Sequence, residues 1–281
     1  MNNIGIYVLF WSLFSYQVVN AQNAIPNGYQ LVWQDEFDSG TKPTADFWSY
    51  ESGFVRNNEL QWYKDDNAFI ENGLLIFEGR REKINNDKHD PESNDWRRKR
   101  PFAEYSSSSI NTRGKYSFQY GILEVRAKID TSMGMWPAIW TLGITRPWPA
   151  NGEVDVMEFY RRRGIPIILA NGAWAEEKNK AKWDESVIPL KELLANQEDW
   201  SERFHIWKMD WTKDRIRLYL DDLLLNEIDL SNTLNPDGFN PFHQEHYILL
   251  NLAIGSNGDD PSNTIFPKRY LVDYVRVYQE R

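Results

Sequence analysis

Short runs of alternating apolar and polar residues dominate the chain. Successive side chains of a strand point to opposite faces, so a period of two is typical of strands with one buried face. Many runs are rich in β-branched and aromatic residues, and turn sequences such as Asn72-Gly73 separate them. Helical periodicity is scarce, and the best candidate is 188–196. The pattern predicts an all-β sandwich or jelly roll, with the clearest strands at 73–78, 121–129, 215–220 and 270–278.

The first 21 residues follow a different pattern. Ile4 to Tyr16 form an apolar run, and Val19-Asn20-Ala21 fits a small-x-small cleavage site, although no Lys or Arg precedes the run. The run is too short to span a bilayer. We therefore expect residues 1–21 to be a signal peptide and residues 22–281 to form one secreted or periplasmic domain, with no membrane attachment after signal removal.

Composition narrows the classes of partner. The net charge of −9 disfavours nucleic acid, because phosphate binding needs a basic face. Two basic runs, 96–100 and 161–163, are either solvated loop charge or a contact for an anionic group on a substrate. The chain has no Cys, which excludes disulfides, Cys-bound zinc and a Cys nucleophile. Its 13 Trp suit a surface that stacks on sugar rings. Polar residues dominate 81–109, which we expect to be a long binding loop.

The segment GEVDVMEFY, at 152–160, is the most informative part of the sequence. It places three carboxylates, Glu153, Asp155 and Glu158, within six residues. In a strand Glu153 and Asp155 share a face, but Glu158 lies at the wrong parity. One extra residue in a β-bulge at Val156-Met157 would return Glu158 to that face. We therefore predict a bulged strand that presents all three acids together.

Three acids on one face repel one another, and at least one keeps its proton at a raised pKa. Such an arrangement gives the fold nothing, but glycoside hydrolysis requires it. In the retaining mechanism an ionised carboxylate attacks the anomeric carbon while a protonated carboxyl delivers a proton to the leaving oxygen. An acidic solvent-facing strand and a metal site are the alternatives, although no His cluster with ligand spacing accompanies the acids.

The same segment resembles the bulged Glu-x-Asp-x-x-Glu signature of glycoside hydrolase family 16, as in laminarinases and agarases. The resemblance extends from Trp33 to Tyr278 and includes WQDEF at 33–37, NNELQWY at 57–63, GMWPAIW at 134–140, FHIW at 204–207, YILLNLAIG at 247–255 and VDYVRVY at 272–278. It implies that 22–281 is a catalytic domain with a concanavalin-like β-jelly roll, a sandwich of two curved antiparallel sheets with substrate in the concave cleft. It implies Glu153 as nucleophile, Asp155 as assisting acid and Glu158 as general acid/base.

The resemblance implies no catalytic cofactor but a structural calcium ion on the convex side. Its ligands would be the main-chain carbonyls of Glu36 and Gly73 together with Asp273. The residues alone give this ion little support, since Asp273 could equally be a solvent-exposed residue of an apolar strand.

Two tryptophans of the WPAIW run are candidates for stacking on sugar rings. Trp136 and Trp140 are four residues apart and would share the face of the acids, although core packing is the alternative for either. Asn58, in the NNELQ run, is the best candidate to bind sugar hydroxyls.

Two departures from the family pattern bear on the substrate. Ser109 stands where laminarinases usually carry Arg. A Thr-x-His pattern common after the catalytic strand is replaced by a stretch that places Asn171 and Trp174 near the expected leaving-side sugar.

The leading hypothesis is an endo-acting β-1,3-glucanase or mixed β-1,3/1,4-glucanase that acts as a monomer. An endo-β-galactan hydrolase of agarase, porphyranase or mucin-glycan type is the alternative, favoured by the long loop expected over 81–109, the basic runs and the two departures. A lectin-like module that binds glycans without cutting them is a third reading, since jelly rolls often have that function. The complete acid triplet disfavours the third reading, because a pure binder has no use for it.

Overall fold

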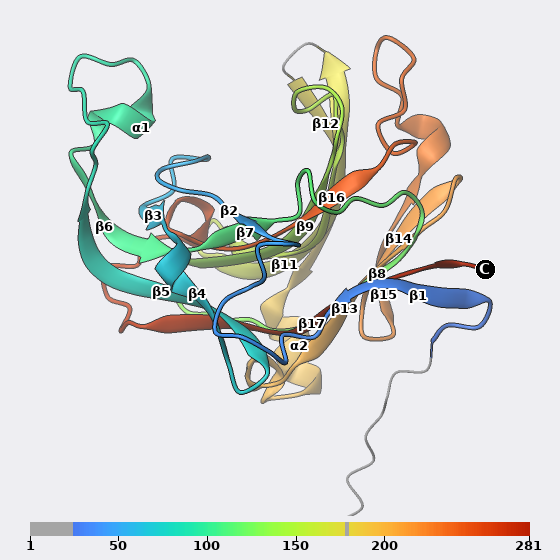
Figure 1. Cartoon of the computed structure of the whole chain (residues 1–281), viewed down its shortest axis with the longest axis horizontal. Coiled ribbons are helices and arrows are strands. Elements are labelled where there is room, and N and C mark those ends of the chain that lie inside the picture. The colour runs from blue at the N-terminus through green and yellow to red at the C-terminus, as the bar shows by residue number, and fades with distance from the viewer. Residues whose placement is uncertain (1–24, 178–179) are drawn as a thin grey trace, which may run out of the picture.

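Two stacked sheets make up the molecule (Figure 1). The structure is a computed structural model that describes residues 25–177 and 180–281. The expected signal peptide, residues 1–21, lies outside these described residues. Both sheets are antiparallel apart from one parallel pair, β3 with β6. The predicted all-β jelly-roll class is confirmed.

The larger sheet has ten strands, in the order β15-β14-β13-β8-β17-β5-β6-β3, with β1 paired to β17 and β4 to β5. Their bounds are β1 Tyr29–Asp35, β3 Gln61–Tyr63, β4 Ala68–Glu71, β5 Leu74–Asn85, β6 Phe102–Ser107, β8 Gly121–Lys128, β13 His205–Trp211, β14 Arg215–Leu220, β15 Leu223–Asp229 and β17 Lys268–Glu280.

The smaller sheet has seven strands, in the order β12-β11-β10-β9-β16-β7-β2. Their bounds are β2 Ser49–Tyr50, β7 Ser109–Asn111, β9 Met135–Gly143, β10 Glu153–Arg162, β11 Ile165–Glu177, β12 Lys180–Pro189 and β16 His246–Ile254. This sheet carries the candidate site on its outer face.

Helices are few and short within the described residues. They are α1 Trp96–Lys99 and α2 Leu190–Asn196, with 3-10 turns at Asp65–Asn67, Trp200–Glu202, Leu230–Asn232 and Ser256–Gly258. The helix predicted over 188–196 is α2, but it starts two residues late because β12 continues to Pro189. None of the helices in the described ranges is long and apolar enough to cross a membrane.

The long loop predicted over 81–109 is wrong in extent. β5 continues to Asn85, and β6 begins at Phe102 as its hairpin partner. The pairing extends beyond the body of the sheet, where β6 is mostly buried but every second side chain of β5 from Arg81 onward is exposed. A charged strand of this kind does not alternate in polarity, which explains why the sequence resembled a loop.

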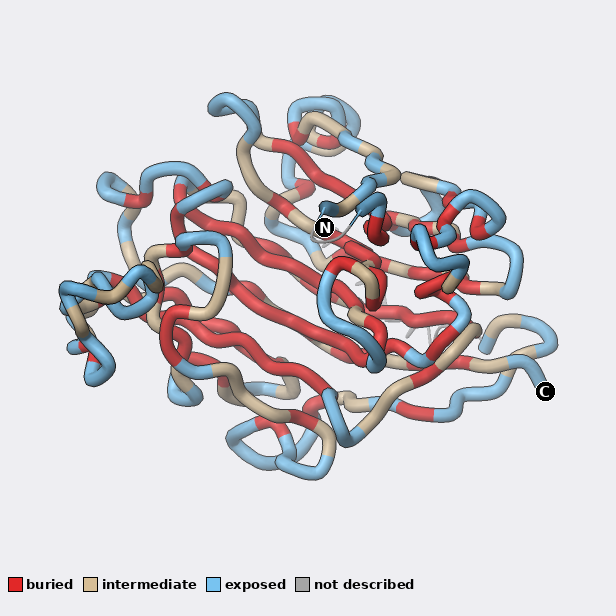
Figure 2. The backbone as a smooth tube through the Cα atoms, turned by 90° about the horizontal axis from the view of Figure 1, so that it is seen from above, coloured by how far each residue is buried: buried red, intermediate tan, exposed pale blue. Residues whose placement is uncertain are grey.

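The inner faces of the two sheets meet in one hydrophobic core. Val154, Met157 and Phe159 of β10 pack there with residues of the other sheet such as Leu123 and Trp207. Each large apolar side chain that is fully buried contributes about 1.5–3 kcal/mol. Figure 2 shows buried strands through the middle of the molecule and exposed segments at its loops and edges. The core therefore holds one face of β10 rigidly, and its opposite face is free to carry polar groups.

The outer face of the seven-stranded sheet is flanked on two sides. β12 rises at one end, and the β5–β6 extension with α1 rises at the other (Figure 1). Between them a second apolar cluster, Ala138, Trp140, Tyr247 and Leu249, lies on the outer face. A cleft runs across this face, lined from β9, β10, β11, β12, β16 and the segment before β3.

Candidate active site

A β-bulge in β10 brings the three acids to one face. The register of β10 against both neighbouring strands shifts after Asp155, before Glu158 on β11 and before Met157 on β9. Val156 and Met157 are both buried in the core, so the chain passes two consecutive side chains inward. Glu153 and Glu158 consequently line the cleft, and Asp155 lies between them with only 1% of its surface exposed.

Burial and mutual repulsion raise the pKa of all three carboxyls. Burial is the main cause for Glu158, with the charge of Glu153 second, and its pKa rises to about 7. Asp155 has its pKa raised well above the usual range by burial and then by the charges of Glu158 and Glu153. The pKa of Glu153 is also raised by burial, but hydrogen bonds from Trp148 and Asp155 and the charge of Arg56 oppose the rise. All three shifts therefore favour the protonated form of this acid cluster, and Glu158 titrates near neutral pH.

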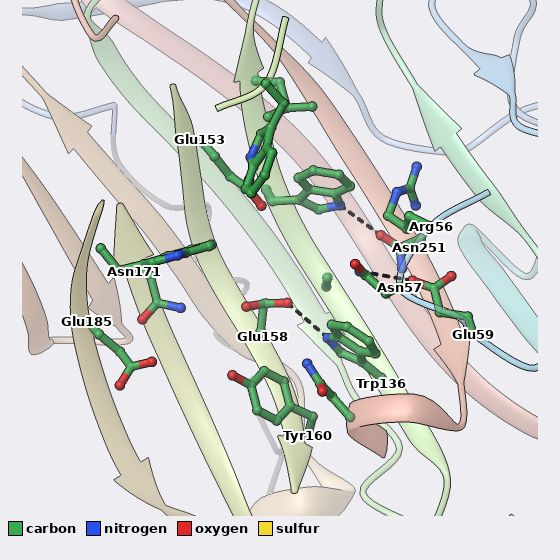
Figure 3. Close-up of a pocket in the computed structure, with 16 residues that line it drawn as sticks. Arg56, Asn57, Glu59, Trp136, Glu153, Glu158, Tyr160, Asn171, Glu185 and Asn251 are labelled. Carbon is green, nitrogen blue, oxygen red and sulfur yellow. Dashed lines mark hydrogen bonds between the residues drawn. The ribbon is translucent and has the colours of Figure 1, made fainter. Parts of the chain in front are cut away.

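Trp136 and Trp140, predicted as sugar platforms, both line the cleft. The indole N–H of Trp136 donates to Glu158 Oε1 at 2.9 Å, as Figure 3 shows. The indole N–H of Trp140 donates to Asn251 Oδ1 at 2.8 Å. Each ring is therefore fixed in orientation by one hydrogen bond. The bond from Trp136 also lowers the pKa of Glu158.

Trp148 is a cleft residue that the sequence did not single out. It lies in the loop between β9 and β10, is 48% exposed, and donates its indole N–H to Glu153 Oε2. The loop is tied down by Arg146, which pairs with Asp237, and by the amide of Asn235, which donates to the carbonyl of Ala150 at 2.8 Å. Its position just before the acid segment was the only signal that could have revealed it.

Asn58, predicted to bind sugar hydroxyls, does not line the cleft. Its side chain is exposed, and its carbonyl accepts a hydrogen bond from Arg100 at 2.9 Å. The neighbouring Asn57 lines the cleft instead and donates to Glu59 Oε1 at 3.3 Å. Both residues have positive φ, 55° and 52°, so the alternation of a strand does not apply to this segment and parity could not tell which side chain points inward.

Trp174 does not lie in the cleft either. It is 4% exposed and packs in the core, edge-on to Phe242 with ring centroids 6.3 Å apart. The physical reason is parity, since Asn171 faces the cleft and a residue three positions later in a strand faces the opposite side. Asn171 donates to Asp155 Oδ2 at 3.2 Å. On the next strand Trp183 lines the cleft and is 45% exposed.

Arg56 enters the cleft near the position of Ser109, where laminarinases usually carry Arg. The Ser109 hydroxyl donates to Glu51 Oε2 at 2.6 Å, and the guanidinium of Arg56 pairs with the same carboxylate. That guanidinium lies 5.1 Å from the centre of the Trp140 ring. A cation is therefore supplied to the cleft from the segment between β2 and β3.

The three residues expected to bind calcium come together on the larger sheet. β17 is paired with β5 before Asp273 and with β1 beyond it, and Gly73 and Glu36 lie one residue outside the ends of those two strands. Two carbonyls and a carboxylate form the all-oxygen donor set that calcium prefers, so the residues fit the ion. Arg126 competes for it, since Nη1 lies 2.5 Å from Asp273 Oδ2. In the described ranges, no three acidic or His side chains cluster as metal ligands.

The cleft thus combines an acid triplet on a bulged strand with aromatic rings beside it. The model of the glycosyl hydrolases family 16 matches residues 80–276. The chain belongs to glycosyl hydrolase family 16. It is 33% identical over 276 residues to a β-glucanase of Rhodothermus marinus, covering 89% of this chain and 85% of that one.

Two further family 16 comparisons differ in how much of each protein is shared. The chain is 32% identical over 279 residues to glucan endo-1,3-β-glucosidase A1 of Niallia circulans, covering 90% of this chain but 38% of that longer protein. A solved structure from work on endo-acting O-glycanases, with which prominent members of the human gut microbiota initiate mucin breakdown, aligns with a TM-score of 0.82 and 33% identity, over 92% of this chain and 93% of that one.

Membership of family 16 decides the type of reaction. Enzymes of this family hydrolyse glycosidic bonds with retention of configuration and need no catalytic cofactor. The protein is therefore a retaining glycoside hydrolase. Retention requires a carboxylate nucleophile and a carboxyl acid/base on the two sides of the scissile bond, and the cleft offers Glu153 and Glu158 for these functions.

Proposed function

We propose that the protein is an endo-acting β-glucanase that cleaves β-1,3- or mixed β-1,3/1,4-glucan through a glycosyl-enzyme intermediate. The observation that carries the mechanism is the acid triplet on one face of β10, whose environments separate the pKa values. Glu153, ionised and held by Trp148, attacks the anomeric carbon. Glu158, with its pKa near 7, protonates the leaving oxygen and later takes a proton from water. Asp155 keeps its proton and positions the nucleophile.

The glucan assignment is supported by two similar proteins and by the residues and extent of the cleft. The two curated relatives named above are a β-glucanase and a glucan endo-1,3-β-glucosidase. The cleft is lined by aromatic rings and neutral amides, including Trp136, Trp140, Asn57 and Asn251. Rings of this kind stack on the apolar faces of pyranoses, and amides bind hydroxyls. A cleft that runs from β12 across to β16 suits internal cleavage of a long chain.

A second candidate is an endo-β-galactan or mucin-glycan hydrolase. One similar solved structure and one departure from the laminarinase pattern, at Ser109, favour it. The structure with a TM-score of 0.82 belongs to work on mucin-degrading O-glycanases. The arrangement of Arg56 and Ser109 also differs from the usual laminarinase pattern. A guanidinium beside the Trp140 platform changes which hydroxyl or anionic substituent that position accepts.

A substrate panel separates the two candidates. Residues 22–281 would be incubated with laminarin, lichenan, agarose, porphyran and desialylated mucin, and reducing ends and product sizes would be followed. Oligosaccharides from laminarin or lichenan support the glucanase. Release only from a galactan or from mucin would replace the substrate assignment by the second candidate and keep the mechanism.

The mechanism itself is tested with Glu153→Gln, which keeps the size of the side chain but removes the nucleophile. Hydrolysis should fall by at least about 10⁴-fold, because the covalent route is lost, while oligosaccharide binding measured by calorimetry persists. Glu192→Gln, which changes an exposed carboxylate on α2 that does not line the cleft, serves as the matched carboxylate control. Activity of Glu153→Gln within tenfold of the unmodified enzyme would refute the nucleophile assignment.

The same proposal includes export and a structural calcium ion. Residues 1–21 support secretion or delivery to a periplasm, which amino-terminal sequencing of the protein recovered outside the cytoplasm would test. Calcium would bind the carbonyls of Glu36 and Gly73 and the carboxylate of Asp273 on the convex side. A rise in melting temperature with added calcium that is lost in Asp273→Ala supports the ion. Equal melting temperatures in calcium and in chelator would leave Arg126 as the partner of Asp273.

A further inference from the structure

β12 presents an unusual row of side chains to the cleft. Trp183, Glu185 and Val187 alternate along one face of this strand, and all three are exposed. The opposite face is attached to β15, where Asp184 accepts a hydrogen bond from Asn226 at 3.1 Å. The orientation of β12 is therefore fixed, and so is the face that Trp183 and Glu185 present. Trp183 and Glu185 both line the cleft.

The register of the sheet aligns this row with the catalytic acids. Glu153 pairs with Ala173 on β11, and Ala173 pairs with Trp183 on β12. Directly paired residues point to the same face, so the three side chains form one line across the strands. With neighbouring strands about 4.8 Å apart, Trp183 lies roughly 10 Å from Glu153 across the sheet. The methyl of Ala173 between them is too small to cover the indole.

Glu185 lies in the next row of paired residues across the strands, on the same face of the sheet. It pairs with Asn171, which in turn pairs with Asp155. Arg162 binds its carboxylate with two hydrogen bonds, of 2.8 and 2.6 Å, which fixes the side chain and neutralises its charge. Each carboxylate oxygen keeps a further lone pair that can accept a hydroxyl proton. An indole face beside an oriented acceptor is the combination that binds a pyranose.

We propose that Trp183 and Glu185 form an outer subsite on β12 that binds one neutral pyranose unit of the polysaccharide, beyond the catalytic acids. This rests on the proposed hydrolase function. The unit stacks on the indole of Trp183 and donates a hydroxyl to Glu185. The subsite lengthens the cleft on the side opposite Asn57 and Arg56, so that long substrates are held on both sides of the scissile bond.

The test uses Trp183→Ala and Trp183→Phe, with Leu224→Ala as a control of similar exposure on β15. The kinetics of each variant would be measured on a ladder of oligosaccharides of increasing length and on an aryl glycoside that is too short to reach β12. Trp183→Ala should raise KM about tenfold for the longest substrates, as expected for loss of one aromatic contact, with little change in kcat. Trp183→Phe should restore most of the affinity, and Leu224→Ala should have no effect.

Two outcomes would overturn the subsite. One is an unchanged KM for long substrates in Trp183→Ala, and the other is an equal loss on the aryl glycoside, which would indicate damage to the catalytic centre. Calorimetric binding of a long oligosaccharide to Glu153→Gln, with and without Trp183→Ala, repeats the comparison without turnover. If Glu153→Gln hydrolyses normally, the catalytic assignment has failed. If Glu153→Gln is inactive, but adding Trp183→Ala to it leaves the affinity for the long oligosaccharide unchanged, the subsite proposal has failed.

Discussion

The hydrogen bond between Trp136 and Glu158 makes a quantitative prediction about the pH dependence of activity. The indole N–H donates to Glu158 Oε1 at 2.9 Å and lowers the pKa of that carboxyl, against the raising effects of burial and of Glu153. Trp136→Phe removes the donor and keeps an aromatic ring for the sugar. The pKa of Glu158 should therefore rise above its value of about 7.

The size of the shift follows from the difference between two hydrogen bonds. A bond to an ionised group contributes about 1.5–3 kcal/mol, and a bond to a neutral group about 0.5–1.5 kcal/mol. The ionised form of Glu158 therefore loses roughly 1–1.5 kcal/mol more than the protonated form. At 1.36 kcal/mol per pKa unit this is an increase of about one unit. The general acid must be protonated to act, so activity is lost as pH rises through this pKa, and the loss should move up by about one unit.

The assay is the pH profile of kcat/KM, which reports ionisations of the free enzyme. Trp140→Phe is the matched control, because its indole lines the same cleft but donates to Asn251 instead of a carboxylate. Both variants should lower the maximum of kcat/KM, because the smaller phenyl ring stacks more weakly on the sugar. Only Trp136→Phe should move the basic limb from near pH 7 towards pH 8. An unmoved or lowered basic limb in Trp136→Phe, or the same shift in Trp140→Phe, would refute the reasoning.

Two further predictions concern the neighbouring acids. Trp148→Phe removes the donor that lowers the pKa of Glu153, so the acidic limb of kcat/KM should move to higher pH; a limb that stays in place would mean the bond does not act on the nucleophile. Glu158→Gln should be inactive but more stable. The folded pKa of Glu158 lies above its unfolded value, so the native carboxyl loses stability as pH rises through about 4.5 to 7. Calorimetry should show a gain of roughly 1–3 kcal/mol at pH 8 and almost none at pH 4; equal effects at both pH values would contradict this.

Local sequence determined the strands and the catalytic segment. Alternation of polarity is imposed by the geometry of a single strand, so the runs at 121–129 and 270–278 could be assigned without their neighbours. The bulge at Val156-Met157 was predictable for the same reason, because three acids can share a face only if two consecutive residues turn inward. These residues do turn inward in the structure, and both are fully buried.

Sequence alone failed where the answer depended on which segments lie side by side. Alternation along β11 separates Asn171 from Trp174, three positions apart, but only the register across β10, β11 and β12 shows which of the two faces the cleft and that Trp183 faces it as well. Asn57 and Asn58 have left-handed backbone, so neither alternation nor spacing tells which side chain points inward.

The pKa differences among the three acids were likewise decided by tertiary structure. The sequence placed Glu153, Asp155 and Glu158 on one face and implied that at least one would be protonated. It could not show that indoles from two other segments would donate to Glu153 and Glu158, or that Arg56 would approach from before β3. Local geometry follows from covalent alternation along one strand, whereas burial and charge at a site depend on residues far apart in the chain. For that reason the sequence determined the chemistry of this protein, and only the packed sheets decided which side chains tune it and which line the cleft.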